Sequence, residues 1–221
     1  MKFRLTFLLL FLSPMLRAQD SQISFLPYYK QQQLKPDVQC ADSITIETLR
    51  FYISSVELLQ NGKVVFKEQN SFHLLDAALP ETMTLTLKPD TTVQYDQIKF
   101  NLGIDSITNT AGIMGGDLDP AKGMYWTWQS GYINMKIEGS SPKCKTRKNE
   151  FQFHLGGYLA PYNPLQTVTL STPSEKNILI NVDLSRFFDV IDLSKQNHIM
   201  SPGKEAMTLS EAAAKMFFIR K

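Results

Sequence analysis

The sequence predicts an all-β fold, an antiparallel two-sheet β-sandwich with one short C-terminal helix. Short runs in which apolar and polar residues alternate recur along the chain, as expected of half-buried strands. Turns rich in Gly, Pro, Asn and Asp separate these runs, and no two runs are joined by a long helical crossover, which disfavours a parallel α/β sheet. With 43% hydrophobic and 20% charged residues, the 221-residue chain can bury a substantial core.

The alternation defines the strands in chain order. The first extended region, residues 44–53, continues toward Asn61-Gly62, a dipeptide that favours a tight hairpin before the apolar residues 64–66. Later strands are predicted where apolar residues alternate with polar ones, at 83–87, 98–102, 151–153, 168–170 and 178–182.

The C-terminal segment predicts the one helix. Thr208 followed by Glu211 has the spacing of a capping box, and the alanine-rich residues 212–216 are good helix formers. We expect this helix to dock its apolar side on the sandwich.

Residues 1–19 read as a secretory signal peptide. Lys2 and Arg4 precede an apolar run over residues 5–12, and a small residue suited to a cleavage site lies near Ala18-Gln19. The run is shorter than the roughly 20 residues that a membrane-spanning helix needs, and no later segment comes close to that length. We therefore expect a periplasmic or secreted protein whose residues 20–221 form a single domain.

The charge balance argues against a nucleic-acid partner. Loss of Lys2, Arg4 and Arg17 leaves 20 basic and 21 acidic residues, so the formal charge of +2 becomes −1. The basic stretch at residues 143–148 is interpreted as a solvated loop because no aromatic residues are interleaved with it.

Cys40 and Cys144 are the two cysteines of the chain. Export makes a disulfide between them plausible, and closing a loop of roughly 100 residues would stabilise the fold by up to about 4 to 5 kcal/mol. Two free thiols are the alternative. Metal ligation by the pair is disfavoured because neither cysteine belongs to a Cys-x-x-Cys or Cys-x-x-His motif.

Catalytic motifs are lacking in the sequence. It contains no Gly-x-Ser-x-Gly elbow, no phosphate-binding glycine loop and only three histidines, which disfavours a nucleophilic hydrolase or a nucleotide-dependent enzyme. We do not expect an enzyme.

The three histidines, His73, His154 and His198, are the candidate metal ligands. None has a second ligand at close spacing, so each alone is read first as a structural or surface residue. In a sandwich, however, ligands come from separated strands and loops. The thioether of a methionine such as Met124 or Met200, together with imidazole, would suit Cu(I).

The segment at residues 123–132 holds both tryptophans, Trp126 and Trp128, between flanking glycines. If the segment is a strand, the two indoles point to the same face, which suits core packing. The glycines would also permit another group to approach closely, as a redox or soft-metal site requires. The pattern alone leaves both interpretations open.

At these residues the chain resembles the methanobactin-associated periplasmic copper-binding proteins, the MbnP-like domains. The aromatic segment and the Leu-Asp-Pro before it are the most specific part of the resemblance, which covers most of the chain after residue 19. The matching segments are 49–56 (LRFYISSV), 73–76 (HLLD), 100–105 (FNLGID), 118–120 (LDP), 123–132 (GMYWTWQSGY), 136–139 (KIEG) and 153–157 (FHLGG).

The resemblance implies a β-sandwich, export, and copper binding in the cell envelope as part of copper homeostasis. It also implies a diheme cytochrome c peroxidase-like enzyme as partner, which oxidises a tryptophan of the binding protein to kynurenine. By this resemblance Trp126 or Trp128 is the modified residue. His73 and His154 lie in matching motifs and are the leading copper ligands, with His198 and Met124 as weaker candidates.

Two alternatives belong to other functional classes. A secreted structural module would use Trp126 and Trp128 only as core and would take up no Cu(I). A carbohydrate-binding module would present Trp and Tyr side chains on an exposed platform, and it would retain glycans in the presence of a metal chelator.

Overall fold

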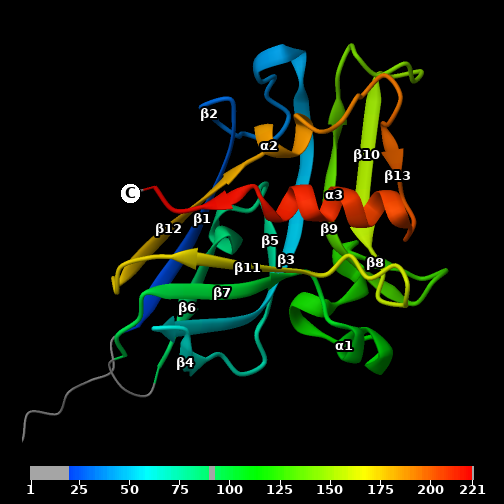
Figure 1. Cartoon of the computed structure of the whole chain (residues 1–221). Helices are drawn as coiled ribbons and strands as arrows, with labels where there is room; N and C mark the ends of the chain where they lie inside the picture. Colours follow the sequence, from blue (N-terminus) through cyan, green and yellow to red (C-terminus); the bar gives the residue numbers. More distant parts are fainter. Residues whose placement is uncertain (1–19, 90–92, 221) are drawn as a thin grey trace, which may run out of the picture.

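Two β-sheets pack against each other in the computed structural model, which describes residues 20–89 and 93–220 (Figure 1). The predicted signal peptide, residues 1–19, lies outside the described residues. The smaller sheet has the strand order β14-β12-β1-β2, and β6 also pairs with β1. Its five strands are β1 (Ser21–Tyr29), β2 (Gln32–Gln33), β6 (Thr84–Leu87), β12 (Asn177–Asp183) and β14 (Phe217–Phe218).

The larger sheet has the strand order β11-β7-β3-β9-β10-β13. Strands β4 and β5 pair with β3, and β8 pairs with β9. Its nine strands are β3 (Thr45–Gln60), β4 (Lys63–Lys67), β5 (Phe72–Asp76), β7 (Gln97–Leu102), β8 (Tyr125–Trp126), β9 (Gly131–Ser140), β10 (Glu150–Gly156), β11 (Gln166–Ser171) and β13 (His198–Ile199).

Strand β3 organises the larger sheet because it pairs with four neighbours. Its first part pairs with β9 and β5, its second part pairs with β4, and β7 pairs with both parts. A bulge between Ser54 and Glu57 separates the two parts, and Ser55 within it has a φ of 52°. The sheet therefore curls, so that β7 and β11 run across the view of Figure 1 while β9 and β10 stand upright.

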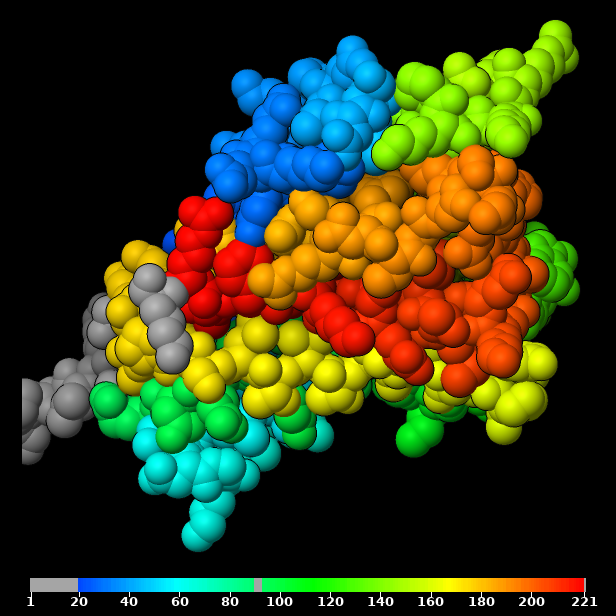
Figure 2. Space-filling model, turned by 45° about the horizontal axis from the view of Figure 1, so that its top comes forward, coloured from blue at the N-terminus to red at the C-terminus, as the bar shows by residue number. Residues whose placement is uncertain are grey.

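The main core fills the space between the two sheets and the C-terminal helices. Phe25 of β1, Phe51 of β3 and Phe100 of β7 each meet Phe217 of β14 edge to face. Helices α2 (Ser185–Phe188) and α3 (Lys204–Ala214) add buried side chains to this core, and α3 contacts β10 and β11. Figure 2 shows these C-terminal segments, orange to red, lying across one face of the molecule.

A second apolar cluster lies on the opposite, outer face of the larger sheet. The segment between β7 and β9 folds over this face and buries Met124 and Trp126 against Tyr52 of β3 and Tyr132 of β9. This part of the sheet is therefore covered on both faces. The helical turns of the chain outside the C-terminal region are η1 (Ala41–Ser43), η2 (Pro80–Met83), α1 (Ser106–Ala111), η3 (Gly116–Leu118) and η4 (Pro120–Lys122).

The structure confirms the predicted β-sandwich and its first hairpin. Asn61 and Gly62, with φ of 51° and 75°, form the two-residue turn between β3 and β4. Most strand pairs are antiparallel, but β1 pairs with β12 and β10 with β13 in parallel. These pairs join segments far apart in the sequence, so no local turn signal could have predicted their direction.

The predicted C-terminal helix is present, but the predicted capping box is wrong. Helix α3 begins at Lys204, so Thr208 lies in its second turn, where Oγ1 donates to the Lys204 carbonyl. The helix ends at Ala214, and Phe217 and Phe218 then form strand β14 on the smaller sheet. Among the described residues, none of the helices is long and apolar enough to cross a membrane.

Cys40 and Cys144 are both buried in the main core. Burial raises the pKa of each thiol above its ordinary value. The disulfide between them stays a prediction from the sequence.

Candidate metal centre

A row of four polar side chains, which we call the histidine row, crosses the outer face of the larger sheet. Asp76 of β5 lies opposite Arg50 of β3, Arg50 lies opposite Lys136 of β9, and Lys136 lies opposite His154 of β10. Residues opposite each other in a sheet project to the same face. The residues that alternate with them along the strands, such as Phe51 and Phe153, belong to the main core on the other face.

His154 is the buried end of this row, with 5% of its surface exposed. Its Nε2 lies 2.6 Å from Oε1 of Glu138, which stands two residues from Lys136 on the same face of β9. This hydrogen bond is the largest cause that lowers the pKa of Glu138 below its ordinary value. The Nδ1 atom is buried and has no hydrogen-bond partner among the described residues. With Nε2–H donating to the carboxylate, a neutral imidazole keeps a free lone pair on Nδ1.

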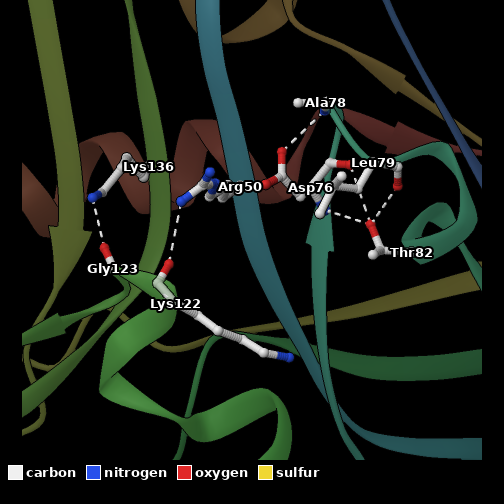
Figure 3. A network of polar contacts seen from close by, with 8 residues as sticks. All are labelled: Arg50, Asp76, Ala78, Leu79, Thr82, Lys122, Gly123 and Lys136. Atoms are coloured by element: carbon white, nitrogen blue, oxygen red, sulfur yellow. Dashed lines mark hydrogen bonds and ion pairs between the residues drawn. The ribbon is translucent and has the colours of Figure 1, made fainter.

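Two cations in the row hold the aromatic segment against the sheet (Figure 3). Arg50 Nη1 donates to the carbonyl of Lys122 at 3.2 Å, and Lys136 Nζ donates to the carbonyl of Gly123 at 2.7 Å. Arg50 is itself fixed by an ion pair with Asp76, 2.7 Å long. Burial lowers the pKa of Lys136. Two successive carbonyls are therefore anchored immediately before Met124.

Met124 and Trp126 follow this anchor and are buried in the outer cluster. Trp126 lies over β10 at Gly156, two residues beyond His154 on the same face. A Cβ atom at Gly156 would lie 2.9 Å from Cζ3 of Trp126 and 2.7 Å from the Tyr132 carbonyl oxygen. The absence of a side chain at Gly156 thus makes room for the indole beside the histidine row.

Trp128 occupies a different environment from Trp126. Strand β8 ends at Trp126, and residues 127–130 form the turn that leads into β9. Trp128 is 65% exposed, whereas Trp126 is 6% exposed. Of the two interpretations left open by the sequence, core packing does not describe Trp128, because strand β8 is too short to contain both tryptophans. Trp126 is buried, but in the outer cluster and not between the two sheets.

The other two histidines differ in their position relative to His154. His198 lies on edge strand β13 opposite Gln152, so it projects to the same face as His154 but is exposed. His73 lies on β5 three residues from Asp76 and therefore projects to the other face, where its Nε2 lies 2.8 Å from Oε2 of Glu68. The structure does not bring His73 and His154 together.

Sequence reasoning missed Glu138 and the two anchoring cations. The signal was present in Lys136-Ile137-Glu138, where two charged residues flank a core residue on a strand and so project together from its outer face. Within residues 20–89 and 93–220, no three His, Cys, Asp or Glu side chains gather into a group that could hold a metal ion. A site at His154 would therefore need a donor of another type, such as the Met124 thioether.

Comparison with known proteins identifies the family. A family model described as MbnP matches residues 18–201. A solved structure, MbnP from Methylosinus trichosporium, superposes with a TM-score of 0.61 at 15% sequence identity and covers 80% of each chain, which supports the same fold. No curated protein matches the sequence. The match to the family model spans most of the chain, which therefore belongs to the MbnP family.

Proposed function

We propose that this chain is an exported copper-binding protein of the cell envelope, with His154 as its anchoring ligand and Trp126 as the target of a diheme peroxidase-like partner. The single observation that carries the proposal is the hydrogen bonding of His154. One ring nitrogen is held by Glu138, and the other is buried without a partner among the described residues. A carboxylate on one nitrogen that leaves the other free is the usual arrangement of metal-ligating histidines.

Two further donors on the outer face of the larger sheet suit a soft monovalent ion. The fully buried Met124 offers a thioether, and His198 projects from the adjacent strand to the same face. Imidazole and thioether together favour Cu(I). Bound copper would supply a polarisable cation beside the indole of Trp126.

We assign the modification to Trp126 because its indole lies beside the histidine row, whereas Trp128 stands in solvent. With hydrogen peroxide as oxidant, cleavage of the indole C2–C3 bond gives N-formylkynurenine while two peroxide molecules are reduced to water. Hydrolysis then releases formate and leaves kynurenine. The products carry a ketone and an aromatic amine, which become new polar groups close to His154.

Copper binding is tested by a Cu(I) titration against a chromophoric chelator under anaerobic conditions. We expect His154→Ala to lose binding and Met124→Leu, which nearly conserves the side-chain volume, to weaken it. His73→Ala is the matched control, since it removes another carboxylate-paired histidine from the opposite face of the same sheet. Wild-type affinity in a folded His154→Ala variant would overturn the assignment.

The modification is tested by coexpression with a diheme partner and intact-mass analysis. Both tryptophans lie between Lys122 and Lys136 and share one tryptic peptide, so fragment ions must locate the change. We expect it on Trp126. Retention of glycans that survives a chelator, with no Cu(I) uptake and no mass change, would instead support the carbohydrate-binding alternative.

A further inference from the structure

The two tryptophans form a pair that connects the buried site to the surface. Their ring centroids lie 5.7 Å apart with planes tilted by 44°. Trp126 is almost fully buried, so an oxidant outside the protein has little direct access to it. Trp128 is mostly exposed and pairs with Trp126 across the turn at residues 127–130. Of the aromatic ring pairs in the described residues, this is the one that includes Trp126.

We propose that Trp128 is the electron outlet of Trp126, the residue through which an external one-electron oxidant withdraws electrons from the buried indole. This inference rests on the proposed function, in which Trp126 is oxidised. The oxidant, a high-potential centre such as the high-valent haem of a partner, takes one electron from Trp128 and is reduced by one electron. Trp126 then supplies one electron to the Trp128 radical cation, which returns to its neutral state while the radical cation resides on Trp126. No bond changes in this step, and the indole N–H protons stay in place.

The surroundings of Trp128 fit contact with such an oxidant. Its ring borders an open depression of about 340 Å³ that is lined by uncharged residues, among them Leu159, Tyr162 and Pro202. Leu159 and Tyr162 are themselves exposed. An oxidant can therefore approach the indole without desolvating a charged side chain of this depression.

The tyrosines of the outer cluster offer a poorer route. Tyr125, Tyr132 and Tyr52 lie in a chain of edge-on rings, with centroid distances of 5.0 Å and 5.9 Å. The Tyr132 and Tyr52 hydroxyls donate to the backbone carbonyls of Leu118 and Asp117. A phenol that loses an electron must also release its proton, and a carbonyl is a weak base. Burial also raises the pKa of Tyr132, which shows that loss of its proton is disfavoured in this environment.

Laser flash photolysis with a soluble one-electron photo-oxidant tests the relay without a partner enzyme. The variants are Trp128→Phe, which removes the relay, Trp128→Tyr, which keeps an oxidisable ring, and Tyr162→Phe, a matched control in the same depression. We expect Trp128→Phe to slow oxidation of Trp126 by about tenfold, in line with the 65% and 6% exposures of the two tryptophans. Trp128→Tyr should restore part of the rate, and Tyr162→Phe should match the wild type.

An unchanged rate of Trp126 oxidation in Trp128→Phe would overturn the relay. Trp126→Phe defines the Trp128 signal, because the Trp128 radical should form in that variant and persist. The test of the relay can be distinguished from the test of the proposed function. Failure of a partner enzyme to produce kynurenine in the wild-type protein would refute the proposed function, whereas the photolysis series judges the relay on its own.

Discussion

At the residue scale, the pair His154–Glu138 makes the stability of the fold depend on pH. The pKa of Glu138 is lowered from an ordinary value of 4.5, chiefly by its hydrogen bond to His154. A lowered folded-state pKa means that the unfolded chain binds protons first as the pH falls. The pair therefore stabilises the fold fully above pH 4.5 and loses that contribution as the pH falls toward the lowered value.

Substitution Glu138→Gln tests this coupling. We expect the variant to be less stable than the wild type near neutral pH and to lose less stability between pH 5 and pH 3, an interval set by the ordinary carboxyl pKa. Urea unfolding at a series of pH values measures both quantities. Parallel stability curves for the two proteins would show that the carboxylate does not have the role described.

Gly156 gives a second prediction at this scale. A methyl group there would collide with the Trp126 ring and with a backbone oxygen, so Gly156→Ala should destabilise the fold by about 1 to 3 kcal/mol through overpacking. It should also shift the fluorescence of Trp126 to the red. Gly115→Ala is the matched control, because no atom lies within 4 Å of the added Cβ. Equal stability losses in the two variants would contradict the described contact.

Some residues of the candidate site could be identified from the sequence, and others could not. His154 was accessible as a candidate because histidine is rare in this chain, but its partner Glu138 was not, since the pairing depends on the register of β10 against β9. His73 looked equivalent to His154 in its sequence motif. Only the alignment of β5 on β3 places His73 on the opposite face.

At the element scale, the anchored segment before β8 determines where the donors lie. Arg50 and Lys136 hold the carbonyls that end η4, and Gly123, with a φ of 73°, turns the chain toward Met124. Because the anchors come from neighbouring strands of one sheet, the segment is positioned by a rigid support. Met124 and Trp126 are thus held over the sheet before any ligand binds.

Removal of one anchor should loosen this segment. Lys136→Met leaves the Gly123 carbonyl without its donor, and we expect a loss of about 1 to 2 kcal/mol in stability together with faster hydrogen exchange over residues 122–127. Lys122→Met is the control, since its exposed ion pair with Asp117 contributes less than about 1 kcal/mol. Identical exchange in Lys136→Met and wild-type protein would refute the anchoring role.

The boundaries of elements were harder to predict than their existence. Alternation identified the strands that face the main core, but the chain after Trp126 keeps apolar and polar residues in alternation while its backbone turns. Ser130, with a φ of 54°, sits at the end of that turn, and Gly131 packs closely against Tyr158. Both features depend on tertiary contacts, which the local pattern does not report.

At the scale of the whole molecule, the two faces of the larger sheet have different roles. Its inner face forms the main core with the smaller sheet and helices α2 and α3, and its outer face carries the histidine row and the outer cluster. Composition and alternation sufficed to predict the sandwich. They could not predict the outer cluster. A strand that is covered on both faces has no solvent-exposed side, so its sequence lacks the alternation that distinguishes one face from the other.

The topology explains why the remaining strand pairs could not be predicted from the sequence. Strand β1 pairs with β12, and β14 pairs with β12 on the other side, so the first and last strands of the described chain flank β12 in the smaller sheet. Such long-range pairs are set by packing of the complete core and leave no local signature. The candidate site has the same character, since its residues come from β9, β10 and the segment before β8.

In the proposed function, the free Nδ1 atom of His154 holds copper on the outer face of the larger sheet. A crystal structure of the Cu(I)-loaded protein, with anomalous diffraction recorded at the copper edge, tests it most directly. We predict an anomalous peak at Nδ1 of His154, with Glu138 still bonded to Nε2 and Met124 close by. Copper at His73, or a loaded protein in which Nδ1 of His154 contacts no metal, would contradict it.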